Sequence, residues 1–481
     1  MKAALRATAI LSSGTVVKIA AGLVVAKAWA VLVGPAGVGS LGLMQSLVGL
    51  VAIAAGAGVG TGVVRLGAAA LGRGERAEVD AIIRAALVLS TVGAALAALA
   101  VVVFRDPLGR TLLDSSLVFG DAVWLGAGVG LTLLTATQLG ILNAHQRVGA
   151  LARATIWGSL GAATVGILVL WQMRSGGLVQ AYVAGLLVTL AASTWELARS
   201  LGRPARPIAR AAVQAAARRL LRFGVPFTAS TVVGTGVTLA LPIVVLHVLD
   251  IQAVGMYRAA LTVTAGYLGF LIASMGQDYY PRLSAAADSD VSRIVNEQLR
   301  LVLLVGAPVI LVAQAASVWI VPIIYAPSFA PAVRVLEWQL TGELFRFWSF
   351  GFAFVILARN SSALYFAIEA IGGALLFVGT WAGLTLLGLV GSGIGFMMAY
   401  IGYAGVVWII VRRTSGVLVD GRTIVLMAGA VGASLVMHAL TVDDGMAGRF
   451  VALVLALAVS GGCAFALWQT FRRAAPVSAG P

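Results

Sequence analysis

Apolar stretches of 18 residues or more recur along the chain from Thr8 to Phe471. A helix of this length crosses the ~30 Å hydrocarbon core of a bilayer. Because every backbone N–H and C=O in lipid must be bonded within the protein, only helices or a closed barrel can span it. The runs are continuous rather than alternating, which predicts helices. With 60% hydrophobic and 11% charged residues, the chain has too few polar side chains for a soluble domain.

The breaks between these runs predict an all-α polytopic membrane protein with about fourteen transmembrane helices. The predicted spans are 8–31, 40–64, 82–104, 120–142, 154–172, 178–198, 224–247, 253–275, 301–324, 336–358, 362–386, 391–411, 422–441 and 450–470.

Basic residues are distributed unequally between alternate loops. One set of loops and both terminal segments carry most of them, and the other set carries only Arg105, Arg110, Arg174, Arg258, Arg334 and Arg449. Because cytoplasmic loops are enriched in Lys and Arg, we expect the first set and both termini to be cytoplasmic. A missed helix would scramble this asymmetry. Topology therefore explains most of the net charge of +15, and nucleic acid is not an expected partner.

The longest cytoplasmic connection divides six spans from the rest. We predict an N-terminal lobe at 1–200, a basic linker helix at 201–222, a C-terminal lobe at 223–413 and an added two-helix hairpin with a tail at 414–481. The linker helix either lies on anionic headgroups or is a solvated connection that only sets topology. Val38-Gly39 and Val254-Gly255 are a weak match between the two halves.

Charged residues inside spans each cost roughly 2.5–3.5 kcal/mol, so each calls for a reason. Lys18, near the middle of the first span, either lines a central cavity as a cation or pairs with a carboxylate. Lys27 either extends its charged end to the outer membrane interface or has a functional role. Arg258 either extends outward in the same way or is a second cation of the cavity.

Gln339, Glu343 and Arg346 form one stripe of the tenth span, where Glu343 and Arg346 are three residues apart and can pair. This pair either only stabilises packing or opens during a transport cycle. Glu369, in the eleventh span, has no local cation; it is neutral, paired with Arg346 or Lys18, or a proton or cation site.

Neutral polar residues and glycines inside the spans fit structural roles. Interhelical hydrogen bonds are expected for Gln45 and Gln138, and close helix packing or a hinge for the run Gly56, Gly58, Gly60 and Gly62. No nucleophile–base constellation, Cys/His metal spacing or cofactor motif appears, since Cys463 is the single cysteine and the three scattered histidines are interpreted as neutral filler. We therefore expect a transporter rather than an enzyme.

Three segments resemble one family. They are 18–27 followed by 34–39, 338–343 with the following Ala358-Arg359 and Tyr365, and 275–282, which includes Asp278. All three resemble the Wzx-type flippases of O-antigen and enterobacterial common antigen assembly, in the multidrug/oligosaccharidyl-lipid/polysaccharide transporter superfamily. The resemblance covers roughly residues 8–412.

This resemblance implies two six-helix lobes around a central cavity, working by alternating access. The implied substrate is an undecaprenyl-diphosphate-linked oligosaccharide, moved from the cytoplasmic to the periplasmic leaflet of the bacterial inner membrane. Further implied partners are membrane lipids, protons or Na⁺ and polysaccharide polymerase machinery, with no cofactor. We assign a cationic cavity to Lys18, Lys27, Arg258 and Arg346, coupling or gating to Glu343, Glu369 and Asp278, and polar lining to Gln45, Gln138 and Gln339.

Two other function classes remain. A multidrug or organic-cation antiporter of the same fold would favour an anionic cavity, whereas intramembrane cations here match or outnumber carboxylates. A polysaccharide polymerase or ligase would carry a large periplasmic loop, and the longest one predicted is only about 15 residues. The family typically has twelve spans, and the added hairpin at 422–470 resembles the fourteen-span lipid II flippases of the same superfamily.

Overall fold

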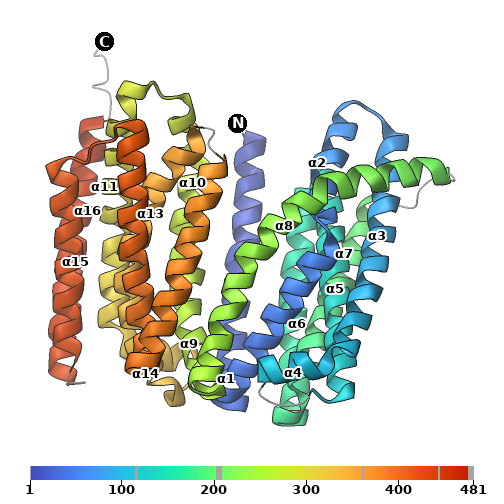
Figure 1. The fold of residues 1–481 in the computed structure, drawn as a ribbon, viewed down its shortest axis with the longest axis horizontal. Helices are drawn as coiled ribbons and strands as arrows, with labels where there is room; N and C mark the ends of the chain where they lie inside the picture. Colours follow the sequence, from blue (N-terminus) through green and yellow to red (C-terminus); the bar gives the residue numbers. More distant parts are fainter. Residues whose placement is uncertain (1, 114–116, 202–208, 360–361, 443–444, 475–481) are drawn as a thin grey trace. The chain divides into compact units, whose positions relative to one another are not determined.

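The computed structural model describes residues 2–113, 117–201, 209–359, 362–442 and 445–474, without the side chains of residues 2–19 and of a few others. These residues form helices joined by short turns (Figure 1). The α-helices are α1 Lys2–Gly56, α2 Val59–Gly72, α3 Arg76–Val103, α4 Arg105–Leu113, α5 Phe119–Ala144, α6 Val148–Met173, α7 Leu178–Leu201, α8 Arg210–Val248, α9 Ile251–Val263, α10 Gly269–Ala285, α11 Asp288–Ala315, α12 Ser317–Ile324, α13 Ala332–Ala358, α14 Ser362–Ser415, α15 Gly421–Thr441 and α16 Met446–Ala474. Single turns of other helix types are η1 Arg174–Gly177, the π-turn η2 Thr264–Leu268 and η3 Pro327–Phe329.

Ten helices among the described residues are long and apolar enough to cross a membrane. Two of them, α1 and α14, run on through a kink, at Gly34 with φ 65° and at Gly388 with φ 64°. Left-handed backbone of this kind costs glycine little, which places the bend at these residues. Both kinks fall inside gaps predicted from the sequence. Helix α14 holds two predicted spans, and α1 holds the first predicted span and part of the second. The prediction of one continuous helix over 40–64 is wrong, because Ala57 with φ 44° and Gly58 with φ 67° separate α1 from α2.

The seventh and eighth predicted spans are not among the ten. The seventh lies in α8, where a shorter apolar stretch runs from Thr235 to Val248. The eighth is divided among α9, the π-turn η2 and α10. The chain is thus an all-α polytopic membrane protein, and the count of fourteen spans stays a prediction.

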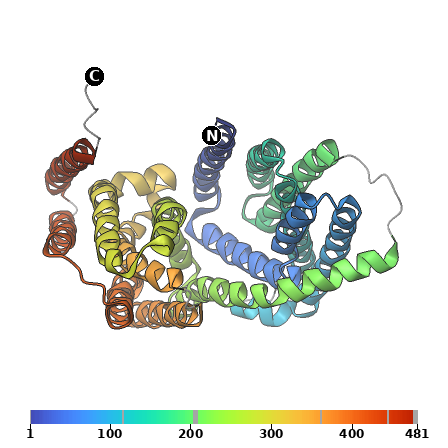
Figure 2. The same cartoon turned by 90° about the horizontal axis from the view of Figure 1, so that it is seen from above.

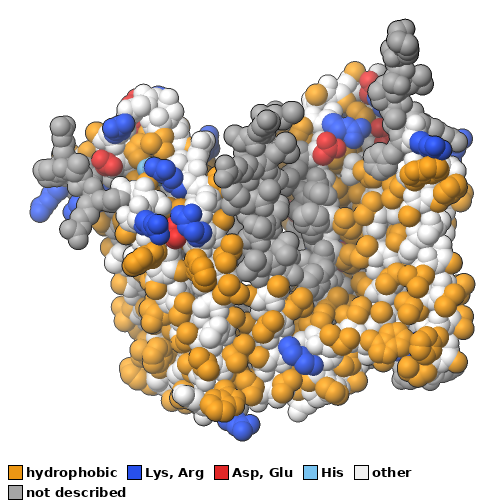
Figure 3. Space-filling model, turned by 180° about the vertical axis from the view of Figure 1, so that it is seen from behind, with side chains coloured by type: hydrophobic (Ala, Val, Ile, Leu, Met, Phe, Trp, Pro, Cys, Tyr) orange, Lys and Arg blue, Asp and Glu red, His pale blue; other side chains and the backbone are white. Residues whose placement is uncertain are grey.

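The chain divides into two compact units, unit 1 at Met1–Gly255 and unit 2 at Met256–Pro481 (Figures 1 and 2). The boundaries predicted at 200 and 223 stay a prediction, as does a cavity between lobes. In Figure 3, hydrophobic side chains cover much of the described surface on this face, and most of the charged side chains lie in its upper half. This distribution fits helices that cross lipid and end in water.

In unit 1, the predicted linker helix is continuous with the seventh span. Residues 202–208 lie outside the described part, and from Arg210 onward the chain forms the single helix α8. Ala216 and Leu220 are fully buried in a core with residues of α2, α3 and α5. On the exposed side, Arg219 donates to Glu78 at 2.6 Å. The apolar side of the basic segment therefore packs on protein.

Glycines bring α8 and the start of α9 against α1 at backbone distance. A Cβ on Gly224 would lie 2.0 Å from the carbonyl oxygen of Ala57, and one on Gly58 would lie 2.5 Å from Gly224. The two matching dipeptides of the sequence also meet, since a Cβ on Gly39 would lie 2.9 Å from the Gly255 nitrogen. Gly58 thus packs closely against α8, and with φ 67° it also stands at the break between α1 and α2, so the structure agrees with close packing and leaves the hinge a prediction.

In unit 2, the α15–α16 hairpin packs on α11 and α13 through buried polar side chains. Ser434 of α15 donates to Gln314 of α11 at 2.8 Å and shares a 2.8 Å hydrogen bond with Thr341 of α13. At one end of the hairpin, Asn296 donates to the carbonyl of Leu418 and accepts from the backbone N–H of Asp420. The hairpin is therefore an integral layer of unit 2.

Candidate functional site

Helix α13 carries the charged stripe predicted for the tenth span. Glu343 is fully buried and the side chain of Arg346 is 20% exposed. Arg346 donates to Glu343 Oε1 at 3.0 Å, which confirms the predicted pair. On the same face, Gln339 is buried and its Oε1 accepts from Thr264 of η2 at 3.3 Å.

Aromatic side chains surround this pair. The Arg346 guanidinium lies 5.7 Å from the ring centroid of Tyr400 on α14 and 5.9 Å from that of Phe350. Tyr400 contacts Tyr403 edge-on at 6.3 Å, and the Tyr403 hydroxyl donates to Glu369 Oε1 at 2.8 Å. The two parts of α14 on either side of Gly388 thus bring a carboxylate and two tyrosines next to α13. We call Gln339, Glu343, Arg346, Glu369, Tyr400 and Tyr403 the α13–α14 polar cluster.

The cluster keeps unused hydrogen-bonding capacity. Glu343 Oε2, Arg346 Nε and Gln339 Nε2 are buried and find no hydrogen-bond partner within the described part of the chain. Burying polar atoms without hydrogen-bond partners costs free energy. These three atoms are therefore available to bind a ligand, a water molecule or, at Glu343, a proton. An anion can compete with Glu343 for Arg346, and a proton can occupy Glu343 when the pair opens.

The other predicted cavity residues lie on α1, α5 and α9. The Lys18 side chain lies outside the described residues. Lys27 on α1 and Arg258 on α9 are half-buried, and each takes part in an interaction. Gln45 is exposed on α1. Gln138 of α5 donates to Thr194 of α7 at 3.0 Å and accepts from its neighbour Ser193, which is the interhelical bonding expected for it.

Asp278 and Glu369 are more exposed than Glu343. The Asp278 side chain is 74% exposed and pairs with Arg282, one turn along α10, at 3.5 Å. Gating by Asp278 remains a prediction without a buried partner to support it. Glu369 is exposed, and its carboxylate accepts a hydrogen bond from the hydroxyl of Tyr403. The sequence did not predict this donor, because Tyr403 lies in the other half of α14.

A second ionic cluster in unit 2 was not predicted from the sequence. Glu337 is fully buried; its Oε1 accepts from Arg449 at 3.1 Å and from Ser317 at 2.8 Å, and its Oε2 accepts from Arg334 at 3.1 Å. His438 Nδ1 lies 3.6 Å from the same Oε2. In the sequence, Arg334 and Arg449 resemble ordinary loop residues and His438 resembles filler. The available signal was the three-residue spacing of Arg334 and Glu337 on α13. We call these five residues the Glu337 cluster.

Comparison with known proteins bears on both the family and the fold. The model of the family described as "Polysaccharide biosynthesis protein" matches residues 4–287, more than half of the chain. The chain belongs to the polysaccharide biosynthesis protein family. The curated protein "Lipid III flippase" of Escherichia coli (strain K12) is 24% identical over 419 residues, which cover 82% of this chain and 94% of the relative.

Solved structures share the fold of this polysaccharide biosynthesis protein. "Lipid II flippase MurJ, inward closed conformation" superposes with a TM-score of 0.71 at 12% identity, covering 97% of this chain and 99% of that one. An inward-facing multidrug resistance MATE family transporter of the MOP superfamily gives 0.66 at 16% identity, covering 84% and 98%. These identities show the fold alone. The relatives are transporters or flippases, which agrees with the expectation that the chain is not an enzyme.

Proposed function

We propose that this protein is a flippase that moves an undecaprenyl-diphosphate-linked oligosaccharide from the cytoplasmic to the periplasmic leaflet of the bacterial inner membrane. Family membership and the distant likeness to a lipid III flippase support this substrate class. The proposal includes fourteen spans in two lobes, alternating access and both termini in the cytoplasm. The unequal distribution of arginine between alternate predicted loops supports that orientation.

The observation that carries the proposal is the buried pair Arg346–Glu343 with its unused polar atoms. A diphosphate headgroup cannot cross hydrocarbon unaided, because an unpaired anion there costs many kcal/mol. A guanidinium presents fixed N–H donors that match phosphate oxygens. When the headgroup takes Arg346, Glu343 is left to bind a proton or cation, which links substrate binding to an ion gradient. Glu369 is the second carboxylate available for that coupling.

Reconstitution tests this directly. Labelled lipid-linked oligosaccharide is placed in the inner leaflet of proteoliposomes, and its exposure on the outer leaflet is followed with and without a pH gradient. Arg346→Ala is expected to slow exposure about tenfold or more, because it removes charged hydrogen bonds to the headgroup. Arg346→Lys keeps the charge and should retain part of the rate.

The matched control is Arg293→Ala. Arg293 has ion pairs of similar length, 3.0 and 3.1 Å, but they lie on the exposed surface of α11. Its loss should leave the flipping rate unchanged. Equal rates in wild type and Arg346→Ala, with both folded by size-exclusion chromatography, would contradict a role for the cluster in substrate handling.

The second candidate function is an organic-cation antiporter. Exposed Glu369 beside Tyr403, with Tyr400 next to it, favours this function, because carboxylates and aromatic faces bind organic cations. The same vesicles loaded with ethidium distinguish the two. Gradient-driven ethidium transport without lipid flipping would replace the first function by the second.

A further inference from the structure

One exposed stripe of helix α8 changes from basic to apolar along its length. Arg218 and Arg222 are exposed one turn apart, and Val225 and Ala229 continue the same stripe as exposed apolar residues. They share a face because residues three, four and seven apart lie on the same side of a helix. The change from Arg222 to Val225 takes place within about 5 Å along the helix axis.

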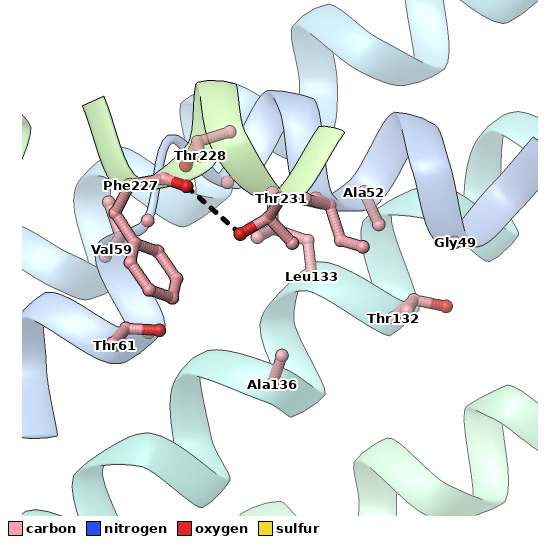
Figure 4. Close-up of a pocket in the computed structure, with 14 residues that line it drawn as sticks. Gly49, Ala52, Val59, Thr61, Thr132, Leu133, Ala136, Phe227, Thr228 and Thr231 are labelled. Carbon is pink, nitrogen blue, oxygen red and sulfur yellow. Dashed lines mark hydrogen bonds between the residues drawn. The ribbon is translucent and has the colours of Figure 1, made fainter. Parts of the chain in front are cut away.

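The opposite side of α8 faces the protein. Ala216 and Leu220 are buried in the core that α8 shares with α2, α3 and α5. Further along the helix, Phe227, Thr228 and Thr231 line a cavity of about 340 Å³ together with residues of α1, α2 and α5 (Figure 4). Figure 2 shows the first half of α8 along one edge of unit 1. The arginine stripe therefore points away from unit 1, toward its surroundings.

Helix α3, which packs on α8 in that core, has a stripe of the same kind. Arg84 is exposed, and Val88, Val92 and Leu96 follow it at four-residue spacing, with 50%, 51% and 63% of their surface exposed. Because α3 is long and apolar enough to cross a membrane, an exposed apolar stripe on it faces acyl chains. Arginines one turn beyond such a stripe lie at the level of the lipid headgroups, where long basic side chains reach phosphate.

Carboxylates of the protein do not neutralise these arginines. Within the described part of the chain, four exposed arginines of the two helices form no ion pair, namely Arg84, Arg210, Arg218 and Arg222. Glu78 of α3 already pairs with two other arginines, at 3.0 and 2.6 Å. Asp80, one turn before Arg84, is not within ion-pair distance of it either. This edge of unit 1 therefore carries uncompensated positive charge.

Unit 2 differs in this respect. Arg282 and Arg293 both pair with Glu297, at 3.2 and 3.0 Å, and Arg300 pairs with Asp420 at 3.4 Å. The distribution of basic residues predicts the same side of the membrane for these arginines as for those of α8. Topology alone does not require an arginine to lack a carboxylate. The counter-charge of the α8 arginines is thus left to the surroundings of unit 1.

We propose that these four arginines of α8 and α3 form a binding surface for the headgroups of anionic phospholipids. Their guanidinium groups donate to phosphate oxygens, and the adjoining apolar stripes contact the acyl chains. An acidic protein segment fits less well, because exposed apolar residues adjoin the arginines on both helices. The proposed orientation places this surface in the cytoplasmic leaflet, whose anionic lipids attract basic segments. The surface binds lipid of the bilayer, and Arg346 remains the site for the transported headgroup.

The test measures binding of phosphatidylglycerol to the full-length protein by native mass spectrometry, with phosphatidylcholine as the neutral lipid. Arg218→Gln/Arg222→Gln is expected to weaken phosphatidylglycerol binding about fivefold or more and to leave phosphatidylcholine binding unchanged. Arg218→Lys/Arg222→Lys keeps both charges and should retain most of the binding. The matched control is Arg282→Gln/Arg293→Gln, which removes two exposed arginines that already pair with Glu297. It should change the affinity less than about twofold.

Three results would overturn the surface, given unchanged melting temperatures. They are equal phosphatidylglycerol affinity in wild type and Arg218→Gln/Arg222→Gln, an equal loss in the control variant, and wild type that binds phosphatidylglycerol no better than phosphatidylcholine. A poly-glutamate peptide tests the other class of partner: if the variant loses binding of this peptide but not of phosphatidylglycerol, the partner is an acidic protein segment. Lipid flipping in vesicles is measured separately, so failure of this surface and failure of the proposed function are distinguishable.

Discussion

Helix α8 and the α15–α16 hairpin are each held in their own unit by different chemistry. At α8, Gly224 brings its backbone against Ala57 so closely that a Cβ would lie 2.0 Å from the carbonyl oxygen. At the hairpin, buried Glu337 accepts hydrogen bonds from Arg449, Ser317 and Arg334. The first contact depends on volume and the second on charge. Adding one methyl group at Gly224 should therefore destabilise the packing of α8 and leave the hairpin unchanged. Removing the charge of Glu337 should destabilise the packing of the hairpin and leave α8 unchanged.

The largest effect is expected from Glu337→Gln, which keeps the shape and removes the charge. Arg449 is 1% exposed and would become a buried cation without its carboxylate. Breaking a buried pair from one side costs about 3–5 kcal/mol, so the melting temperature in detergent should fall sharply. Cys463 on α16 is the single cysteine of the chain and is half-buried, so its maleimide labelling rate should rise.

The double variant Glu337→Gln/Arg449→Met supplies the control. It removes both charges of the pair, and replacing a buried ion pair by neutral side chains is often close to neutral. Most of the lost stability should return. If single and double variants melt alike, charge is not what holds the hairpin.

An intermediate effect is expected from Gly224→Ala. The added methyl group overpacks the contact with Ala57 and should cost about 1–3 kcal/mol of unfolding free energy. Labelling of Cys463 should not change, because the hairpin is untouched. Gly22→Ala on α1 is the matched control: a Cβ there meets nothing within 4 Å, so stability should stay constant or rise by up to about 1 kcal/mol. Equal losses in the two alanine variants would show that the close contact does not matter.

The smallest effect is expected at the start of α15. Asp420 accepts from the backbone N–H of Thr423 at 2.7 Å and pairs with Arg300 at 3.4 Å. Partial burial alone would raise the pKa of Asp420, but the Thr423 hydrogen bonds and the charges of Arg300 and Arg422 outweigh it and hold this pKa below its ordinary value. Asp420→Ala should cost about 1 kcal/mol, the usual worth of a helix cap.

The pH dependence of this residue has a definite sign. With a lowered pKa, the charged form stabilises the fold above the ordinary carboxyl pKa, and that contribution is lost as the pH falls through the folded-state value. Asp420→Asn keeps a cap acceptor and should lose this acid-dependent part. The check is the melting temperature of wild type and variant from pH 6 down to about pH 3. If the melting temperatures of wild type and variant fall in parallel with pH, the loss of stability in acid is due to other carboxylates.

Much of the fold follows from the order of residues alone. Apolar runs and loop arginines located the helices, and the breaks predicted around residues 32–39 and 387–390 contain the kinks at Gly34 and Gly388. Spacing along one helix also predicted the Glu343–Arg346 pair, since residues three apart share a face.

Contacts between distant segments could not be predicted in this way. Glu337 and Arg449 are 112 residues apart. An arginine near the end of an apolar run has the same sequence pattern whether its side chain reaches water or pairs with a buried carboxylate. The helix break at Ala57 and Gly58 has the same limitation. Its glycines resemble packing residues, and no local pattern shows that a helix starts at Val59 without a cap.

The buried carboxylate of Glu337 ties two stretches of the gene together. A chain ending after α14 would lack Arg449, and Glu337 would keep Arg334 of its own helix as a cation. Its Oε1 would then keep only the Ser317 hydroxyl, so the carboxylate would be less well compensated. We therefore expect relatives without the last two helices to carry a neutral residue at the position of Glu337 more often than relatives that have them.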